Sequence, residues 1–279
     1  MKIAYQGIEG SYSSLAAHKY APEAERSGYP TFAAVIDAVQ KNEVTHALLP
    51  IENSTAGRVA DLHHLLSSSD LTIIDEYFLP VQHALIGLKT ASLSDILQAY
   101  SHREALAQCT QSLNKLDIES VSYGDTAKAV LFVSETENKN FAAIASTYSA
   151  TLYDNVHVLK KGMQDVPDNV TRFLILTKKP VYKPLNSDCI TSIVYDVLDA
   201  PSALYDSLGA FAENQINIIK LESFVPMQRH KKAHFYLECI GSPQTNPLKE
   251  ALAQLEKNTK RMRILGTYKK SPYRSTFEQ

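Results

Sequence analysis

The stretch Asp168–Phe173 (DNVTRF) follows a turn and runs directly into the apolar segment Phe173–Leu176. The apolar residues predict a buried strand, so the polar residues lie where this strand begins. Loops at such positions on a rigid scaffold commonly carry functional side chains. Thr171 offers a hydroxyl, and Arg172 offers a planar cation suited to a carboxylate. The alternative is a plain turn followed by an edge strand. The choice between the two depends on the rest of the chain.

Two similar junctions precede this stretch. Lys2–Gln6 is predicted as a short buried strand, and Gly7–Ser13 turns it into a helix through residues 15–17. Glycines followed by serines expose backbone N–H groups at a helix start, which favours an anion, although the third glycine of the dinucleotide fingerprint is missing. The strand Thr45–Ile51 likewise ends in polar residues, Glu52–Gly57. Ligands of open α/β sheets bind at such carboxyl ends.

The first 180 residues alternate predicted strands and helices, with at least five polar strand-to-helix junctions. This alternation favours a largely parallel sheet. Crossings near Pro80 and Asn155 predict two lobes with the junctions facing a cleft. Ser101 and Glu104 form a capping-box pattern that predicts a helix start. The other expected elements are helices at Phe32–Gln40, Val59–Leu66, Leu93–Gln98, Thr126–Val133 and Tyr148–Leu152, and strands at Leu71–Phe78, Val81–Gly87, Ile118–Val121, Phe141–Ala145 and Val156–Leu159.

A smaller domain is predicted after a linker at Pro180–Pro184. Its elements follow the order strand, helix, strand, strand, helix, strand, which is the ferredoxin-like βαββαβ pattern. Residues 271–279 are interpreted as a loose tail. The elements are expected at Ile190–Val197, Ala203–Asn214, Ile216–Phe224, Ala233–Ile240, Leu248–Asn258 and Met262–Tyr268.

The composition is that of a globular protein of two or three domains, with 279 residues, 44% hydrophobic and 21% charged. A formal net charge of −2 gives no long-range field for nucleic acid or anionic lipid, and no apolar run is long enough to span a membrane. Three widely separated cysteines suit a reducing compartment, and the chain starts with a strand and not a signal peptide. We therefore expect a cytoplasmic protein that binds neither nucleic acid nor membrane.

The sequence offers no pattern for a metal site or for a serine nucleophile. No Cys or His pair has zinc spacing, and no G-x-S-x-G elbow is present. His102 and Cys109 fit a helix surface and a core better than a nucleophile pair.

Several stretches together resemble the prephenate dehydratase family with a C-terminal ACT domain. They are Gly7–Ser13, Pro50–Ser54 with Gly57, Tyr100–His102 with Ala105–Cys109, Asp125–Ala127 and Asn169–Phe173. The resemblance spans nearly the whole chain. It implies a two-lobed catalytic domain similar to periplasmic binding proteins at residues 1–180, with lobe one at about 1–79 and 156–180 and lobe two at about 80–155. It also implies an ACT regulatory domain at 188–270 and neither metal nor cofactor.

The resemblance also implies roles for particular residues. Thr171, Glu52, Asn53, Ser101 and Gln108 take the catalytic positions, and Ser11, Ser13, Ser54, Thr126, Asn169, Arg172 and Phe173 are expected to bind substrate. The substrate would be prephenate, which loses water and carbon dioxide to give phenylpyruvate. The chain departs from the family at Arg103-Glu104, where Pro-Gln is common.

The ACT resemblance implies L-phenylalanine as an effector and a homodimer or homotetramer. Effector contacts are expected at Ala203, Leu204, Asn217, Glu222 and Ser223. The family's Gly-Ala-Leu-Val and Glu-Ser-Arg-Pro segments read here Ser202–Tyr205 and Glu222–Val225, so we expect weaker effector binding than is usual. An arogenate dehydratase and a non-catalytic amino-acid-sensing protein of the same shape remain alternatives.

Overall fold

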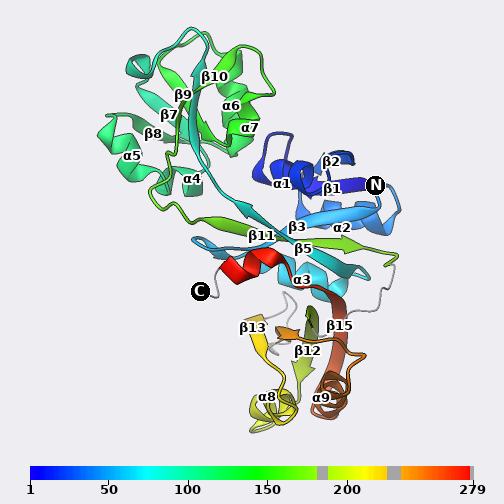
Figure 1. Cartoon of the computed structure of the whole chain (residues 1–279). Coiled ribbons are helices and arrows are strands. Elements are labelled where there is room, and N and C mark those ends of the chain that lie inside the picture. Colours follow the sequence, from blue (N-terminus) through cyan, green and yellow to red (C-terminus); the bar gives the residue numbers. More distant parts are fainter. Residues whose placement is uncertain (181–187, 225–233, 277–279) are drawn as a thin grey trace. The chain divides into compact units, whose positions relative to one another are not determined.

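The computed structural model describes residues 1–180, 188–224 and 234–276, which form a mixed α/β protein with three sheets (Figure 1). The expected alternation of strands and helices is confirmed over most of the chain, and α2 has the expected bounds, Phe32–Gln40. The expected linker Pro180–Pro184 lies outside the described residues except for Pro180.

The first sheet has six strands and contains the junctions at Gly7 and Glu52. Its central strands are apolar and fully buried, as at Leu48, Leu49 and Leu174, whereas the edge strand β2 is polar and was not expected from the sequence. In sheet order the strands are β2 (Glu25–Tyr29), β1 (Lys2–Gln6), β3 (His46–Asn53), β11 (Val170–Thr177) and β5 (Thr72–Pro80), with β4 (Gly57–Arg58) paired to β3. The helices that connect these strands include α1 (Tyr12–Tyr20), α2 and α3 (Ala60–Ser68).

The second sheet has five strands and is mixed. Strand β7 runs parallel to both β8 and β9, but β6 runs antiparallel to β9 and β10, so the expected largely parallel arrangement holds only for part of it. The order is β10 (Val156–Lys161), β6 (Ala84–Leu88), β9 (Phe141–Ala145), β7 (Gln98–Ser101) and β8 (Glu119–Ser122). Its helices are α4 (Arg103–Ala107), α5 (Thr110–Lys115), α6 (Thr126–Glu135) and α7 (Thr147–Ala150).

Two local expectations in this region were wrong. The helix expected at Leu93–Gln98 is a single 3-10 turn at Leu93–Asp95, and Gln98 already begins β7. The capping box is also absent, because Ser101 ends β7 and its Oγ donates to the Ile144 carbonyl at 2.6 Å. The helix cap is His102 instead, whose Nδ1 accepts from the Glu104 backbone N–H at 3.3 Å.

The third sheet has four antiparallel strands and follows the expected βαββαβ order. Helices α8 and α9 lie against each other on one face of it (Figure 1), over a core that includes Phe211, Leu237 and Leu248. The sheet order is β13 (Ile218–Phe224), β14 (His234–Ile240), β12 (Cys189–Val197) and β15 (Thr259–Lys269), and the helices are α8 (Ala203–Glu213) and α9 (Asn246–Lys257).

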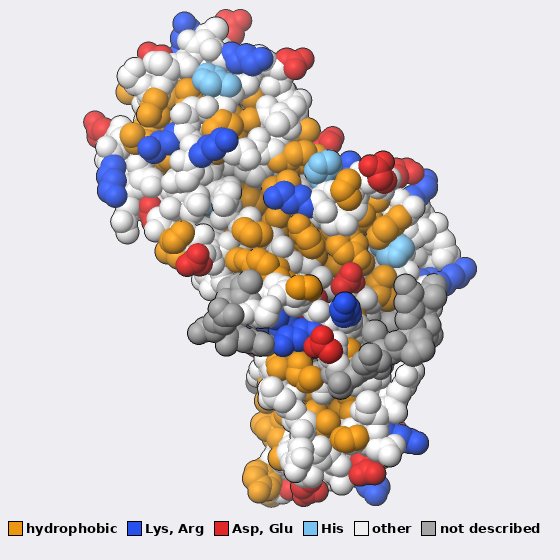
Figure 2. All heavy atoms as spheres, in the orientation of Figure 1, with side chains coloured by type: hydrophobic (Ala, Val, Ile, Leu, Met, Phe, Trp, Pro, Cys, Tyr) orange, Lys and Arg blue, Asp and Glu red, His pale blue; other side chains and the backbone are white. Residues whose placement is uncertain are grey.

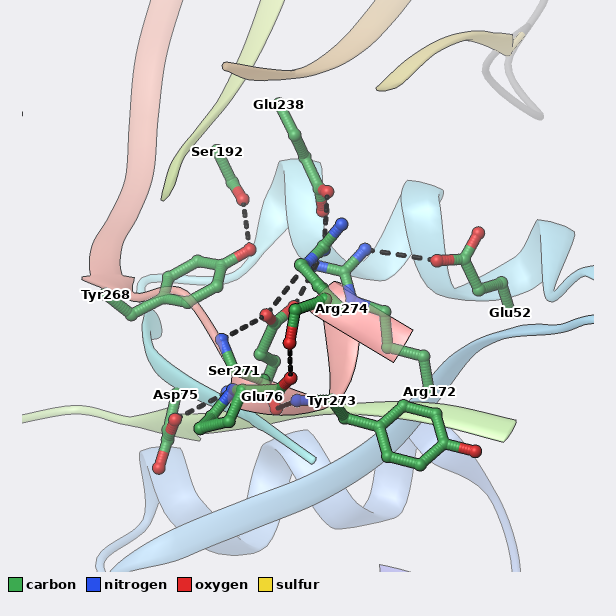
Figure 3. A network of polar contacts seen from close by, with 12 residues as sticks. Glu52, Asp75, Glu76, Arg172, Ser192, Glu238, Tyr268, Ser271, Tyr273 and Arg274 are labelled. Atoms are coloured by element: carbon green, nitrogen blue, oxygen red, sulfur yellow. Dashed lines mark hydrogen bonds and ion pairs between the residues drawn. The ribbon is translucent and has the colours of Figure 1, made fainter. Parts of the chain in front are cut away.

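The C-terminal segment is ordered by a buried ion pair, so the expected loose tail was wrong for residues 272–276. A 3-10 helix spans Pro272–Thr276, and Arg274 donates from Nε and Nη2 to the two carboxylate oxygens of Glu76, each at 2.8 Å (Figure 3). The Glu76 side chain is fully buried. Residues 277–279 lie outside the described part of the chain.

The chain divides into two compact units. Unit 1 comprises Met1–Val35, Leu48–Arg58 and Phe78–Phe173, and unit 2 comprises Ile36–Ala47, Val59–Tyr77 and Leu174–Gln279. The division passes through the strands β3, β5 and β11. The catalytic and regulatory domain boundaries expected from the sequence stay a prediction.

The visible surface carries charges of both signs, interspersed and without a large patch of one sign (Figure 2). None of the helices in the described ranges is long and apolar enough to cross a membrane. Within the same ranges, no group of three or more His, Cys, Asp or Glu residues is placed to hold a metal ion.

Candidate functional site

Unit 1 contains a pocket of about 380 Å³ at the polar ends of its strands. The lining comes from segments that are far apart in the sequence, as expected for ligand sites at the carboxyl ends of strands in an α/β fold. These are the end of β1 with the start of α1, the β3–β4 turn, the segment before β6, helix α4, the start of α6 and the entry to β11. The lining residues are Gln6, Ser11, Tyr12, Ser13, Asn53, Ala56, Val81, His83, His102, Glu104, Ala105, Gln108, Gly124, Asp125, Thr126, Asn169 and Thr171.

Two helices direct their N-termini to this pocket. Ser11 caps α1 by accepting from the Ser14 backbone N–H at 3.2 Å, and Asp125 caps α6 by accepting from the Ala127 N–H at 2.7 Å. Each helix start carries a partial positive charge from its aligned peptide dipoles. The α1 start therefore gives the pocket a place suited to an anionic group, whereas at the α6 start the Asp125 carboxylate already accepts from the Ala127 and Lys128 N–H groups. The described lining includes no Lys or Arg.

A chain of side-chain amides joins Thr171 to Gln108 across the pocket wall. Asn53 donates from Nδ2 to Thr171 Oγ1 at 2.9 Å and to Asn169 Oδ1 at 2.7 Å. Asn169 in turn donates from Nδ2 to Gln108 Oε1 at 2.7 Å. Because the Thr171 oxygen accepts from Asn53, its own hydroxyl hydrogen can be donated to a bound molecule.

The chain continues into two residues that sequence reasoning missed. His83 contacts Gln108 Oε1 through Nε2 at 2.9 Å, and its Nδ1 lies 2.7 Å from the Tyr12 hydroxyl. Burial lowers the pKa of His83, partly offset by the bond to Gln108, and burial raises the pKa of Tyr12 well above its ordinary value. Near neutral pH the pair therefore presents a neutral imidazole and a protonated phenol. The only signal in the sequence was a histidine within an apolar strand pattern.

A match to a protein-family model identifies the family of this chain. The model described as prephenate dehydratase matches residues 3–181. The chain belongs to the prephenate dehydratase family. The family resemblance expected from the sequence motifs is thereby confirmed.

Relatives match this family member over most of its length. A bifunctional N-acyl-homoserine lactone acylase/prephenate dehydratase of Komagataeibacter europaeus is 34% identical, with 98% of this chain and 97% of the relative covered. The chloroplastic arogenate dehydratase/prephenate dehydratase 2 of Arabidopsis thaliana is 34% identical, with 96% of this chain and 72% of the relative covered. The crystal structure of prephenate dehydratase from Arthrobacter aurescens in complex with L-Phe is 27% identical, has a TM-score of 0.88, and covers 97% of this chain and 90% of that one.

Seven of the twelve residues expected to take part in prephenate dehydratase catalysis or binding line the pocket. They are Thr171, Asn53, Gln108, Ser11, Ser13, Thr126 and Asn169. The structure brings these residues together from segments up to 160 positions apart, between Ser11 and Thr171.

The other five residues are not among those that line the pocket. Ser54 accepts from the Val170 backbone N–H at 2.9 Å and so fixes the β11 entry. Ser101 and Phe173 are buried in the core. Arg172 is only 2% exposed and forms an ion pair with Glu52 at 3.2 Å (Figure 3). Neither residue is among those that line the pocket, although both were expected to act on the substrate.

The residues expected to bind an effector all lie in unit 2. Ala203 and Leu204 begin α8, and Ser202 before them has φ 65°, a left-handed conformation that glycine adopts at less cost. Asn217 precedes β13 and its carbonyl accepts from the Ile240 backbone N–H at 2.9 Å, while Glu222 and Ser223 lie on β13. Their role in effector binding stays a prediction.

Proposed function

We propose that the protein is a prephenate dehydratase, a carbon-oxygen lyase that converts prephenate to phenylpyruvate with loss of water and carbon dioxide. One observation carries the proposal. The Thr171 hydroxyl lines the pocket and accepts from Asn53, so its hydrogen is available for the hydroxyl group that leaves the substrate. Formation of the aromatic ring drives the reaction, so the enzyme has mainly to fix geometry and assist this departure.

The pocket offers groups that can bind the substrate and assist the departure of its hydroxyl. One carboxylate of prephenate can bind at the start of α1, and Ser11, Ser13 and Thr126 offer side-chain donors. Thr171 is too weak an acid to transfer a proton by itself, so it acts as a hydrogen-bond donor to the departing oxygen. A donor held in place in this way contributes about 3–4 kcal/mol, or about 10²–10³ in rate.

A second substrate is favoured by the charge of the pocket. Arogenate carries an ammonium where prephenate has a keto oxygen, and the carboxylates of Glu104 and Asp125 line the pocket. Glu104 stands where the family commonly has glutamine, so this chain has one additional negative charge there, although Arg103 lies 3.4 Å from it. The Arabidopsis relative named for both substrates agrees with this second candidate.

Purified protein supplied in parallel with prephenate and with arogenate tests both candidates. We expect phenylpyruvate from prephenate with a higher kcat/KM than that for phenylalanine formation from arogenate. A reversed ratio would make arogenate dehydratase the function. Activity with neither substrate would contradict the lyase proposal and leave an amino-acid-sensing protein of the same two-lobed shape.

Regulation by L-phenylalanine is the remaining part of the proposal. The βαββαβ order of residues 189–269 supports an ACT domain, and the Arthrobacter aurescens relative is in complex with L-Phe. We infer that L-phenylalanine binds near Ala203, Leu204, Asn217, Glu222 and Ser223 of a cytoplasmic homodimer or homotetramer. The left-handed Ser202 in place of glycine is consistent with weaker binding than is usual in the family.

A further inference from the structure

The direction of the hydrogen bonds along the pocket wall is fixed at one end by the backbone. Asn53 Oδ1 accepts from the backbone N–H groups of Thr55 at 3.0 Å and Ala56 at 2.8 Å. A peptide N–H can only donate, so the Asn53 amide has a single possible orientation. Its Nδ2 must therefore donate to both Thr171 and Asn169.

The orientation of Asn53 also determines the donor and acceptor roles of the next side chains, as far as the His83 imidazole. Asn169 uses its oxygen toward Asn53, so its Nδ2 donates to Gln108 Oε1. An oxygen that faces His83 can only accept, which puts the imidazole hydrogen on Nε2. In the neutral ring Nδ1 is then bare and accepts from the Tyr12 hydroxyl, 2.7 Å away, whose single hydrogen has the Gln82 carbonyl at 2.9 Å as its other acceptor.

The same two bonds hold Gln108 in one orientation. Its Oε1 accepts from Asn169 and from His83, and a flipped amide would set its NH₂ against two donors. The described residues offer no acceptor for the Gln108 Nε2 group, and Gln108 lines the pocket. An unflipped Gln108 therefore keeps an N–H donor available to a bound oxygen.

We propose that His83 is a positioning residue, which locks Gln108 as a hydrogen-bond donor to the substrate through its Nε2–H tautomer. The proposal rests on the dehydratase function proposed above. His83 is 3% exposed, so water cannot readily replace its bond to Gln108. The pocket then presents two donors to the substrate, the Thr171 hydroxyl and the Gln108 amide, and both depend on the direction set at Asn53.

Three substitutions of His83 separate positioning from packing. Glutamine can place an N–H near the position of Nε2, asparagine can place one only near Nδ1, and leucine has neither. The backbone bonds of His83 to the Gln164 side chain (2.9 Å) and to Met163 (2.9 Å) are available to every variant. We expect His83→Gln to keep kcat within about threefold, and His83→Asn and His83→Leu to lower kcat about 10–100-fold with KM changed less than threefold, because a misplaced donor costs mainly orientation.

Far-UV circular dichroism and thermal midpoints establish that each variant is folded, and His83→Asn decides the question if His83→Leu does not fold. Equal losses in His83→Gln and His83→Asn would overturn the proposal, as would a glutamine variant worse than the asparagine variant. A loss that appears only in KM would also overturn it.

The tautomer can be measured without any substrate. In ¹⁵N-labelled wild-type protein above pH 7, the long-range nitrogen spectrum of the His83 ring should show the hydrogen on Nε2 and a bare Nδ1. A hydrogen on Nδ1 alone would overturn the proposal. Because this readout needs no activity, an Nε2–H tautomer in a protein that converts neither prephenate nor arogenate would contradict the proposed function and not the bonding geometry.

Discussion

Arg172 and Glu52 form an ion pair at 3.2 Å in which one partner is 2% exposed and the other 32% exposed. The Arg172 guanidinium also lies 6.0 Å from the centre of the Phe78 ring. Each charged residue is next to a pocket residue, since Glu52 precedes Asn53 and Arg172 follows Thr171. The pair therefore fixes the two strands β3 and β11 where they present Asn53 and Thr171.

A double-mutant cycle on this pair should reveal strong coupling. Glu52→Gln leaves the buried guanidinium without its carboxylate charge, so we expect the free energy of unfolding to fall by about 1–3 kcal/mol. In an Arg172→Met background the same substitution should cost less than half as much. Urea denaturation of the four proteins measures the coupling. Additive effects would show that the pair contributes nothing as a pair.

The Thr171 hydroxyl can be removed without changing the shape of the side chain. We expect Thr171→Val to lower kcat about 10²–10⁴-fold, because the departing hydroxyl loses its donor. Thr171→Ser keeps the hydroxyl and should retain more activity than the valine variant, which makes it the matched control. Steady-state kinetics with prephenate measures both. A valine variant with more than half of the wild-type kcat would contradict the assigned role.

The sequence predicted seven of the lining residues because their polar side chains stand where an element ends or begins. Asn53 ends β3, Thr171 lies at the entry of β11 and Thr126 begins α6, and the apolar patterns of these elements allowed their common position to be inferred. The pairing of Tyr12 with His83 could not be inferred, because it joins residues 71 positions apart and a histidine within an apolar strand pattern does not indicate its partner. The burial of Arg172 was missed for the same reason, since its partner Glu52 is 120 residues away.

The C-terminal errors have a related cause. Residues 271–279 contain few apolar residues, which favours a loose tail when only the local pattern is considered. Their ordered structure comes instead from Glu76, a distant carboxylate that offers both oxygens to Arg274.

The capping box predicted at Ser101 does not form, because β7 continues through that residue and its hydroxyl donates to the Ile144 carbonyl.

L-Phenylalanine binding can be tested by adding one charge at the expected effector site. Isothermal titration should show saturable binding to the wild-type protein. Leu204 is 38% exposed at the start of α8, and Leu204→Glu should weaken binding at least about tenfold because it replaces an apolar contact for the phenyl ring with a carboxylate that would have to lose its hydration. Ala253→Glu adds the same charge on an exposed position of α9 and should leave binding unchanged.

Two results would contradict the effector proposal. If the titration gave no heat up to millimolar L-phenylalanine, the domain at residues 188–270 would have only a structural role. Equal weakening in both variants would place the site elsewhere or show a general charge effect. Point variants are preferable to deletion of residues 188–279, because the deletion also removes the guanidinium that neutralises the buried Glu76.

Arg274 is expected to contribute strongly to the stability of unit 2. Its guanidinium lies between two carboxylates with fully buried side chains, Glu76 at 2.8 Å and Glu238 at 3.5 Å (Figure 3). Arg274→Met leaves both buried carboxylates without this counter-charge, and we expect the free energy of unfolding to fall by about 3–5 kcal/mol.

The matched control is Lys269→Met, which removes an exposed cation from the end of β15 and should change stability by less than about 0.5 kcal/mol. A second variant, Arg274→Met combined with Glu76→Met, should recover part of the loss, because an apolar pair removes the buried carboxylate that has lost the Arg274 guanidinium. Urea denaturation of the full chain measures all four proteins. If Arg274→Met were no more destabilising than Lys269→Met, the C-terminal helix would be ordered by its packing alone and the buried ion pair would not stabilise the fold.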